Sequence, residues 1–469
     1  MSISTEFNLG RPSGGRRIDP ESPLRILVLA DWLGDAQASV PLAERRPLKI
    51  DIDNFHQVMA RLAPRVHLGG AEALEFADIE DFHPDRLCRR LPALKSLIQL
   101  YRDLDDPTRV QALIDSLEPP TESASADSPS GDTATDLERL LGGRPSGQAR
   151  VQDEQSRIRK MLGELVAPHL VDTRSAEPHR KAVVARLAEE LNKVLHAPGF
   201  QSLEANWRGL WWLVSQLVSE EVQMAVLPVT EDEIRADLQA AGTNLETAAL
   251  TRHIAGSPTS APWSLVVGLF EFGPQVEDIM ALTAMAVIAE VASVPLIAAA
   301  SPQMVGCDAP SDLVDPARWA AGPEGEAMEL WQALRQSSAG QWISLVLPGV
   351  IARLPYGPET DPIDSIEFSE SAARASSLPR FSGALAVAAA LGIQFENYGG
   401  DMDPGTPVAL DDLPGFSFSE DGEARFQSAV EVALPDRALD ALVQRGLTPL
   451  SGAINRTDVH VPGCFSLAG

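Results

Sequence analysis

Acidic side chains able to act as general acids, bases or metal ligands are gathered in two clusters, at 78–85 and at 103–106. Two carboxyl groups held at a suitable separation can serve as acid and base. In a protein with an excess of acidic residues, however, such clusters are usually solvated faces and helix caps. The sequence therefore offers carboxylates without a pattern that assigns them to a reaction.

Other chemical motifs are missing from the sequence. The eight histidines are scattered, the three cysteines lie far apart at 88, 307 and 464, and no phosphate-binding or dinucleotide-binding glycine motif follows a predicted strand. The acidic segment GGDMDPGTP at 399–407 lacks the ligand spacing of a calcium loop and is typical of a surface loop. We predict no catalytic residue, no cofactor and no metal site, although catalytic groups from distant segments would leave no local motif.

The length and the charge of the chain limit its possible architecture and partners. It has 469 residues, 44% of them hydrophobic, and a formal charge of −28, so we expect two or three globular domains. This charge argues against nucleic acid and anionic membranes as partners, because both attract basic surfaces. Few cysteines and an N-terminus without an apolar stretch favour a reducing cytoplasm.

The longest apolar run, at 279–300, could suggest a membrane span. Glu290 lies at its middle and Pro295 interrupts it. A charge at mid-span is costly in a bilayer, so we predict a buried helix that ends before Pro295 and leads into a core strand. We expect no membrane insertion.

The first module is predicted to cover residues 21–117, after a flexible arm at 1–20. LRILVLA at 24–30 has the continuous apolar character of a buried strand, and 48–52 alternates. Asp53 or Asn54 can cap a helix that runs to Leu62, and a second acidic cap near Asp81 opens a further helical segment.

A segment at 118–136 separates this module from the rest. It consists of Pro, Ser, Thr, Ala, Gly and acidic residues, with no large apolar side chain. Such a composition cannot bury enough surface to offset chain entropy, so we predict a disordered linker.

Beyond the linker we expect a helical lead-in at 137–180 and a large domain at 181–469. Short helices are predicted at 137–141 and 158–166, and a longer one at 182–195. Strand-like runs alternate with helical ones, which indicates an α/β domain with a mixed or parallel sheet and flanking helices. The expected strands are 222–229, 263–270, 296–300 and 342–347, and the expected helical stretches are 230–254, 274–292 and 325–336. The region 365–469, rich in Gly and Pro, is expected to be looser.

The segment PGFQSLEANWRGLWWLV at 198–214 carries three of the eight tryptophans. On a helical period its Phe, Leu and Trp residues form one broad apolar face, with Trp212 off that face and Glu204, Asn206 and Arg208 opposite it. Pro198 suits the helix start. Such a face is more often core packing than recognition, but a large interface would need the same side chains.

Three segments of the first module resemble the small subunit of the type VI secretion contractile sheath. They are LRILVLADW at 24–32, ERRPLKIDIDNFHQVM at 44–59 and LEFADIEDFHPDRLCRRLPALKSL at 74–97. The family has Gly and Phe where Ala30 and Trp32 stand, and Asp in place of Glu80.

The part after the linker resembles the large sheath subunit. The matching segments are LNKVLHAPGFQSLEANWRGLWWLV at 191–214, LVVGLFEF at 265–272, PLIAAASPQMVG at 295–306, LWQALRQSSAGQWISLVLPGVIARLPYG at 330–357 and AVEVALPDRALDALVQRGLTPLSG at 429–452. Gly349 replaces an arginine of the family, and Phe381, Ser382 and Gly383 replace an aromatic-Gly-Asn helix start. The sequence ends at Gly469, where the large subunit would continue through a C-terminal segment that links protomers.

This resemblance implies a sheath-like fold made of two modules that are ordinarily two chains and are joined here by the linker. The two subunits of the family form an obligate heterodimer, whose interface must be large and apolar. The residues that we expect to form or support interfaces are Phe200, Leu203, Trp207, Arg208, Gly209, Trp211, Arg353, Pro355, Tyr356, Asp436 and Arg437.

The resemblance also implies a non-enzymatic structural role as a fused protomer that polymerises around an inner tube. The expected partners are other sheath protomers, inner tube hexamers, baseplate proteins and a AAA+ unfoldase that recycles contracted sheath. The region that this unfoldase engages in the large subunit is internal here, which argues against recycling by the usual route. The alternative, favoured by the end of the sequence at Gly469, is a non-polymerising accessory protein that caps, regulates or bridges sheath and baseplate.

Overall fold

The computed structural model describes residues 22–36, 38–68, 73–105, 176–256, 261–370, 377–420, 423–452 and 456–468. The expected arm at 1–20, the linker at 118–136 and the short helices at 137–141 and 158–166 lie outside these residues. The chain divides into two compact units, and neither is continuous in sequence. The first unit comprises Met1–Phe82, Val194–Pro355 and Ser371–Gly469, and the second comprises His83–Lys193 and Tyr356–Glu370.

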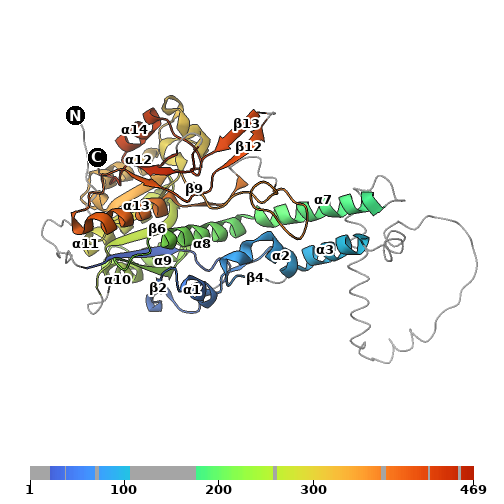
Figure 1. Ribbon diagram of the computed structural model, residues 1–469. Coiled ribbons are helices and arrows are strands. Elements are labelled where there is room, and N and C mark those ends of the chain that lie inside the picture. The colour runs from blue at the N-terminus through green and yellow to red at the C-terminus, as the bar shows by residue number, and fades with distance from the viewer. Residues whose placement is uncertain are drawn as a thin grey trace, which may run out of the picture. The chain divides into compact units, whose positions relative to one another are not determined.

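A seven-stranded mixed sheet forms the centre of the first unit (Figure 1). Its strand order is β14-β8-β7-β6-β1-β5-β2, and only the edge strand β2 runs antiparallel to its neighbour. The strands are β1 (Leu24–Ala30), β2 (Leu48–Ile50), β5 (Val222–Pro228), β6 (Leu265–Phe272), β7 (Leu296–Ala300), β8 (Ile343–Leu347) and β14 (Thr448–Pro449). The predictions of α/β class and of every strand in this sheet except β14, which was not predicted, are confirmed to within a few residues.

Helices cover both faces of this sheet. One face packs against α9 (Glu231–Ala241), α10 (Ala249–Ala255), α11 (Val276–Ala292) and α12 (Gly325–Gln336). The other face carries α13 (Gly383–Tyr398), which contacts strands β5 to β8 and packs against α8 (Pro198–Gln216). Because both faces are covered, the parallel strands read as continuous apolar runs in the sequence.

The apolar run at 279–300 folds as predicted. Helix α11 ends at Ala292, Ser293 takes a left-handed conformation with φ of 55°, and β7 begins at Leu296. Among the helices that the structure describes, none combines the length and apolar character that crossing a bilayer requires.

The region 365–469 is more ordered than expected. Helix α13 is buried along most of its length, because alanines and glycines let it lie close to the sheet. The expectation of a looser region was wrong here. The many Gly and Pro residues suggested irregular structure, but the Ala-rich segment between them forms helix α13.

Smaller elements complete the first unit. They are α1 (Phe55–Leu62), α14 (Asp436–Gln444), β3 (Arg65–Val66), β4 (Leu74–Glu75), β9 (Val350–Ile351), β10 (Arg380–Phe381), β11 (Val408–Leu410), β12 (Phe416–Glu420), β13 (Glu423–Gln427), β15 (Ser451–Gly452) and β16 (Val459–Val461). Short 3-10 helices lie at η1 (Leu42–Glu44), η2 (Ile79–Phe82), η4 (Leu245–Thr247), η5 (Pro302–Val305), η6 (Pro310–Val314), η7 (Pro316–Arg318), η8 (Ala339–Trp342) and η10 (Gly399–Asp401).

The second unit contains α2 (Pro84–Arg90), α3 (Pro92–Asp105) and most of α7 (Ala176–Leu195). The start of α2 is capped by His83, whose Nδ1 accepts a hydrogen bond from the Asp85 amide at 3.2 Å. The Asp85 carboxylate accepts from the amides of Asp364 and Ser365 at 3.1 and 2.9 Å. The 356–370 segment is thereby fixed to this helix start.

Candidate functional site

Strand β1 lies at the centre of the sheet, although it comes from the N-terminal module. It pairs with β5 along its whole length, from Leu24 opposite Val222 to Ala30 opposite Pro228. On its other side it pairs with β6. The side chains from Ile26 to Leu29 are fully buried, and each contributes about 1.5–3 kcal/mol of hydrophobic stabilisation. We call this contact between residues 22–82 and the segments after residue 194 the seam.

The tryptophan helix α8 carries the aromatic part of the seam. The Trp207 ring lies 5.2 Å from that of Trp32 and 5.6 Å from that of Phe55, measured between centroids, and its indole N–H donates to the Trp32 carbonyl at 3.3 Å. The Trp211 ring lies 4.9 Å from Phe55. These edge-on contacts add about 0.5–1.5 kcal/mol per pair beyond area burial. The apolar face of α8 therefore packs against aromatic residues of the N-terminal module.

The N-terminal end of α8 repeats this arrangement. The Phe200 ring packs edge-on against Phe76 and Phe82 at 5.9 and 5.6 Å, and those two rings stack on each other at 4.3 Å. Leu203 is also buried. Aromatic side chains thus line the seam from the start of α8 to its middle.

Glu204 was predicted to lie opposite the apolar face of α8, and it is not on a solvent-exposed side of the helix. Glu204 is fully buried, and its Oε1 accepts from Arg208 Nε at 2.8 Å and from Arg353 Nε at 2.9 Å. A buried carboxylate persists only when cations and donors replace its hydration. The Glu204 contact also fixes Arg353, in the loop after β9, against α8.

Trp212 was likewise expected to lie off the packed face, and it is buried and stacked on Phe381 at 5.4 Å. Helix α8 is enclosed on this side by β10 and α13. At Gly209 an added Cβ would lie 2.6 Å from the Cβ of Phe381, so only glycine permits this approach. A simple two-faced pattern fails because α8 is packed on both sides.

An ion pair also joins the two sides of the seam. Arg45 Nη1 donates to Glu233 Oε2 at 2.8 Å, and Arg45 Nη2 contacts Glu233 Oε1. Arg45 Nη1 also donates to the Pro228 carbonyl at 2.7 Å. Glu233 also completes the capping box of α9 with Thr230. Hydrogen bonding to Arg45 holds the pKa of Glu233 below its usual range.

The remaining expected interface residues lie elsewhere. Tyr356 belongs to the second unit, where its amide donates to Glu370 Oε2 at 3.0 Å and its ring packs against His83 at 5.1 Å. Pro355 ends the preceding segment of the first unit. Asp436 and Arg437 are exposed on the first turn of α14, and Arg437 pairs with Asp315 at 3.4 Å. The structure brings together Phe200, Leu203, Trp207, Arg208, Gly209, Trp211 and Arg353.

Sequence reasoning did not select the partners of these residues. They are Trp32, Phe55, Phe76, Phe82, Glu204 and the pair formed by Arg45 and Glu233. A signal was present, because an aromatic residue lies within or closes each short segment of the first module: LADW, IDNF, LEF and EDF.

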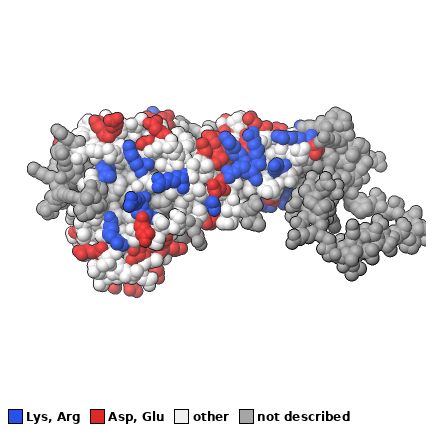
Figure 2. All heavy atoms as spheres, turned by 90° about the horizontal axis from the view of Figure 1, so that it is seen from below, with Lys and Arg blue, Asp and Glu red and all other residues white. Residues whose placement is uncertain are grey.

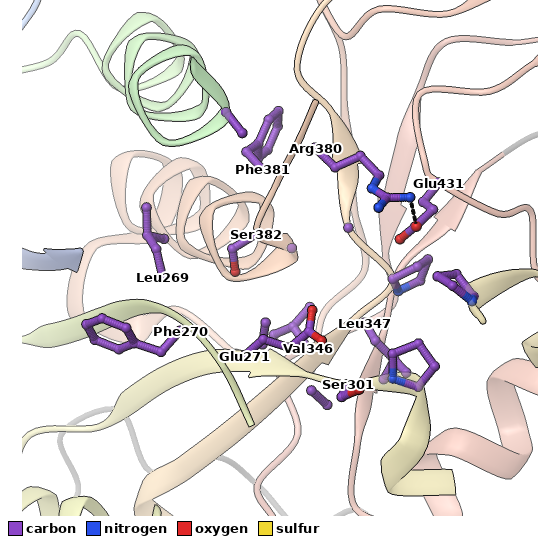
Figure 3. Close-up of a pocket in the computed structure, with 18 of the residues that line it drawn as sticks. Leu269, Phe270, Glu271, Ser301, Val346, Leu347, Arg380, Phe381, Ser382 and Glu431 are labelled. Atoms are coloured by element: carbon purple, nitrogen blue, oxygen red, sulfur yellow. Dashed lines mark hydrogen bonds and ion pairs between the residues drawn. The ribbon is translucent and has the colours of Figure 1, made fainter. Parts of the chain in front are cut away.

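A crevice of about 470 Å³ lies where β6, β7 and β8 end (Figure 3). Arg380 and Glu431 form an ion pair at its wall, while Glu271 and Asp308 also line it. Burial raises the pKa of Glu431; Arg380 opposes this shift, and Glu271 adds to it. Among the described residues, no cluster of His, Cys, Asp or Glu has the make-up of a metal site.

Residues 181–467 match the family described as VipB, the EvpB/VC_A0108 tail sheath N-terminal domain. This match covers more than half of the chain, which therefore belongs to this family of sheath proteins. Residues 9–110 match a second family, described as type VI secretion system, VipA, VC_A0107 or Hcp2. One chain thus carries the two sheath subunit families, which agrees with the resemblance found in the sequence.

A curated relative is the type VI secretion system sheath protein TssC1 of Pseudomonas aeruginosa. It is 29% identical over 294 residues, which cover 59% of this chain and 58% of the relative. The match therefore spans less than two thirds of that protein's length.

Proposed function

We propose that this chain is a structural component of a type VI secretion contractile sheath, a fused small and large subunit protomer that assembles around an inner tube. The observation that carries the proposal is the position of β1. The strand from the small-subunit part lies between two strands of the large-subunit part, with hydrogen-bonding partners on both sides. Two proteins that share a sheet in this way form one building block.

In this proposal the linker at 118–136 acts as a tether. The small-subunit-like domain at 21–117 and the large-subunit-like domain at 181–469 are then held at a high effective concentration and a fixed one-to-one ratio. The seam supplies the permanent contact within the protomer, whereas the contacts between protomers are heterologous and repeat without closing. Contraction would be a rigid-body change between two packings of these protomers.

The wider setting follows from the same proposal. We expect a cytoplasmic protein whose further partners are inner tube hexamers, baseplate proteins and a AAA+ recycling unfoldase. We propose no enzymatic activity and no nucleic acid partner, since a sheath acts through assembly and the chain carries a charge of −28.

Electron microscopy of the purified full chain, with and without its tube protein, tests the proposal. We expect tubular polymers or rings whose length increases when the tube protein is present. A protein that stays monomeric at all concentrations and binds only to the ends of preformed sheath would contradict polymerisation and favour an accessory role.

Cleavage of the linker tests the fused protomer separately. A protease site inserted within 118–136 should yield two fragments that elute together in size-exclusion chromatography, because β1 remains paired on both sides. Fragments that separate while each stays folded would refute the shared building block.

A further inference from the structure

A basic cleft lies at the end of the sheet where the parallel strands begin. Its cavity of about 650 Å³ is bordered by Arg25 at the start of β1, Lys49 on the edge strand β2, Arg252 on α10, and Arg46. Met224 and Trp263 are among its apolar lining residues, and both are buried. None of the described lining residues is Asp or Glu. In a chain with a charge of −28 such a surface is unusual.

The positive charges of this cleft are largely uncompensated. Within the described ranges, Arg46 and Arg252 form no ion pair, and both are exposed. The Arg25 guanidinium lies 4.5 Å above the Trp263 ring and donates to backbone carbonyls, which leaves its charge without a carboxylate partner. Lys49 is 3.6 Å from Asp51, but its side chain is 72% exposed. On the face of the molecule that Figure 2 shows, basic side chains lie interspersed with acidic ones.

The other end of the same sheet, where the parallel strands finish, carries acidic side chains. The crevice at the ends of β6, β7 and β8 is lined by Glu271, Asp308 and Glu431, against one arginine, Arg380 (Figure 3). Arg380 is already paired with Glu431. Within the described part of the chain, Glu271 and Asp308 have no ion-pair partner. The parallel strands of the sheet all point the same way, so these two charged hollows lie at opposite ends of the sheet within the first unit.

We infer that the basic cleft docks against the carboxyl-edge crevice of a second copy of this chain, with Arg46 and Arg252 facing Glu271 and Asp308. The inference rests on the proposed function and names the contact between protomers that the function requires. Two complementary surfaces at opposite ends of one unit join copies head to tail. This arrangement extends a row of copies without closing it, as a sheath needs.

The charges make a second copy the favoured occupant of the cleft. Two copies with a charge of −28 each repel at long range, so a stable contact needs local complementarity. Complementary charges steer association and fix the register between partners, and like charges placed face to face cost several kcal/mol. A nucleic acid could also bind a basic cleft, but it would be repelled by the rest of the surface.

Charge reversal in the full-length protein tests the contact. One variant carries Arg46→Glu and Arg252→Glu, and a second carries Glu271→Lys and Asp308→Lys. In 0.1 M salt we expect each variant alone to need at least about tenfold more protein than the wild type to assemble, measured by sedimentation velocity and electron microscopy. A 1:1 mixture should assemble again, because the reversed cleft of one copy fits the reversed crevice of the other.

A matched control reverses two charges outside both hollows. Arg318→Glu and Glu326→Lys change exposed residues that border neither cavity and should leave assembly as in the wild type. Circular dichroism should show all variants folded. Raising the salt to 1 M, where the Debye length falls to about 3 Å, should weaken wild-type assembly.

The outcomes separate this inference from the proposed function. Variants that assemble like the wild type, or a folded 1:1 mixture that does not assemble, would overturn the contact and leave the sheath proposal standing. A wild type that never assembles, even with its tube protein, would overturn both. Binding of single-stranded DNA that is lost in the cleft variant would assign the cleft to another ligand.

Discussion

The two strands that the N-terminal module adds to the sheet differ in position, in direction and in the burial of their side chains. Strand β1 lies at the centre, with parallel partners on both sides, and its side chains from Ile26 to Ala30 are fully buried. Strand β2 lies at the edge, pairs only with β5 and exposes Lys49 beside the basic cleft. An edge strand is open to other chains, whereas a central strand is closed to them.

This difference separates permanent from exchangeable association. The seam around β1 and α8 is apolar and aromatic, as in an obligate interface, and it cannot open without exposing the core. In the proposed contact the charged surfaces at the two ends of the sheet can separate at little cost, because their exposed side chains return to water on release. A sheath that contracts needs both kinds of contact.

The largest effect is expected when one residue in each strand is replaced by aspartate, which compares the central strand with the edge strand. Val28→Asp places a carboxylate at a fully buried position on one face of the sheet. We expect a loss of more than about 5 kcal/mol and an unfolded or insoluble protein, because burial removes the carboxylate from water. Lys49→Asp in β2 should cost less than about 1 kcal/mol. Urea unfolding and soluble yield measure both, and comparable losses would remove the distinction between centre and edge.

The apolar pattern of the sequence was sufficient to place the five strands at the centre of the sheet, although not β14 at its edge. LRILVLA at 24–30 and the runs near 222, 265, 296 and 343 are all strands, because a buried parallel strand needs no alternation. The order of the strands could not be read in this way. That β1 separates β5 from β6 depends on contacts between residues some 200 or more positions apart, which leave no local periodicity.

Aromatic packing offers the second test. Trp207→Ala should destabilise the first unit by about 3–5 kcal/mol, because a fully buried indole is replaced by a cavity between Trp32 and Phe55. Trp319→Ala is the matched control, since Trp319 is only partly buried at the margin of the core, with the Arg445 guanidinium 4.9 Å from its ring. Equal losses of unfolding free energy in the two variants would show that α8 gains nothing from the seam.

The same helix shows why its sidedness was misjudged. Leu203 and Trp207 lie on the predicted apolar face, and the face opposite holds Glu204 in a buried pair with Arg353. A periodic pattern assigns polar residues to solvent. It cannot reveal that an arginine nearly 150 positions away forms a buried ion pair with this carboxylate.

The smallest effect is expected for the ion pair between Arg45 and Glu233. This pair connects the segment before β2 to α9, so its pH dependence tests one contact of the seam. The pKa of Glu233 is lowered in the folded protein, so the pair stabilises the fold above the pKa of an unfolded glutamate, about 4.3. That stabilisation is lost as the pH falls through the folded pKa. We expect the wild type to lose more unfolding free energy than Glu233→Gln between pH 7 and pH 3. The difference should be at most about 1 kcal/mol, since 36% of the Glu233 side chain is exposed and solvent screens the pair. Thermal melts across this pH range measure the stability of both proteins. The same pH dependence of stability in the two would refute stabilisation by this ion pair.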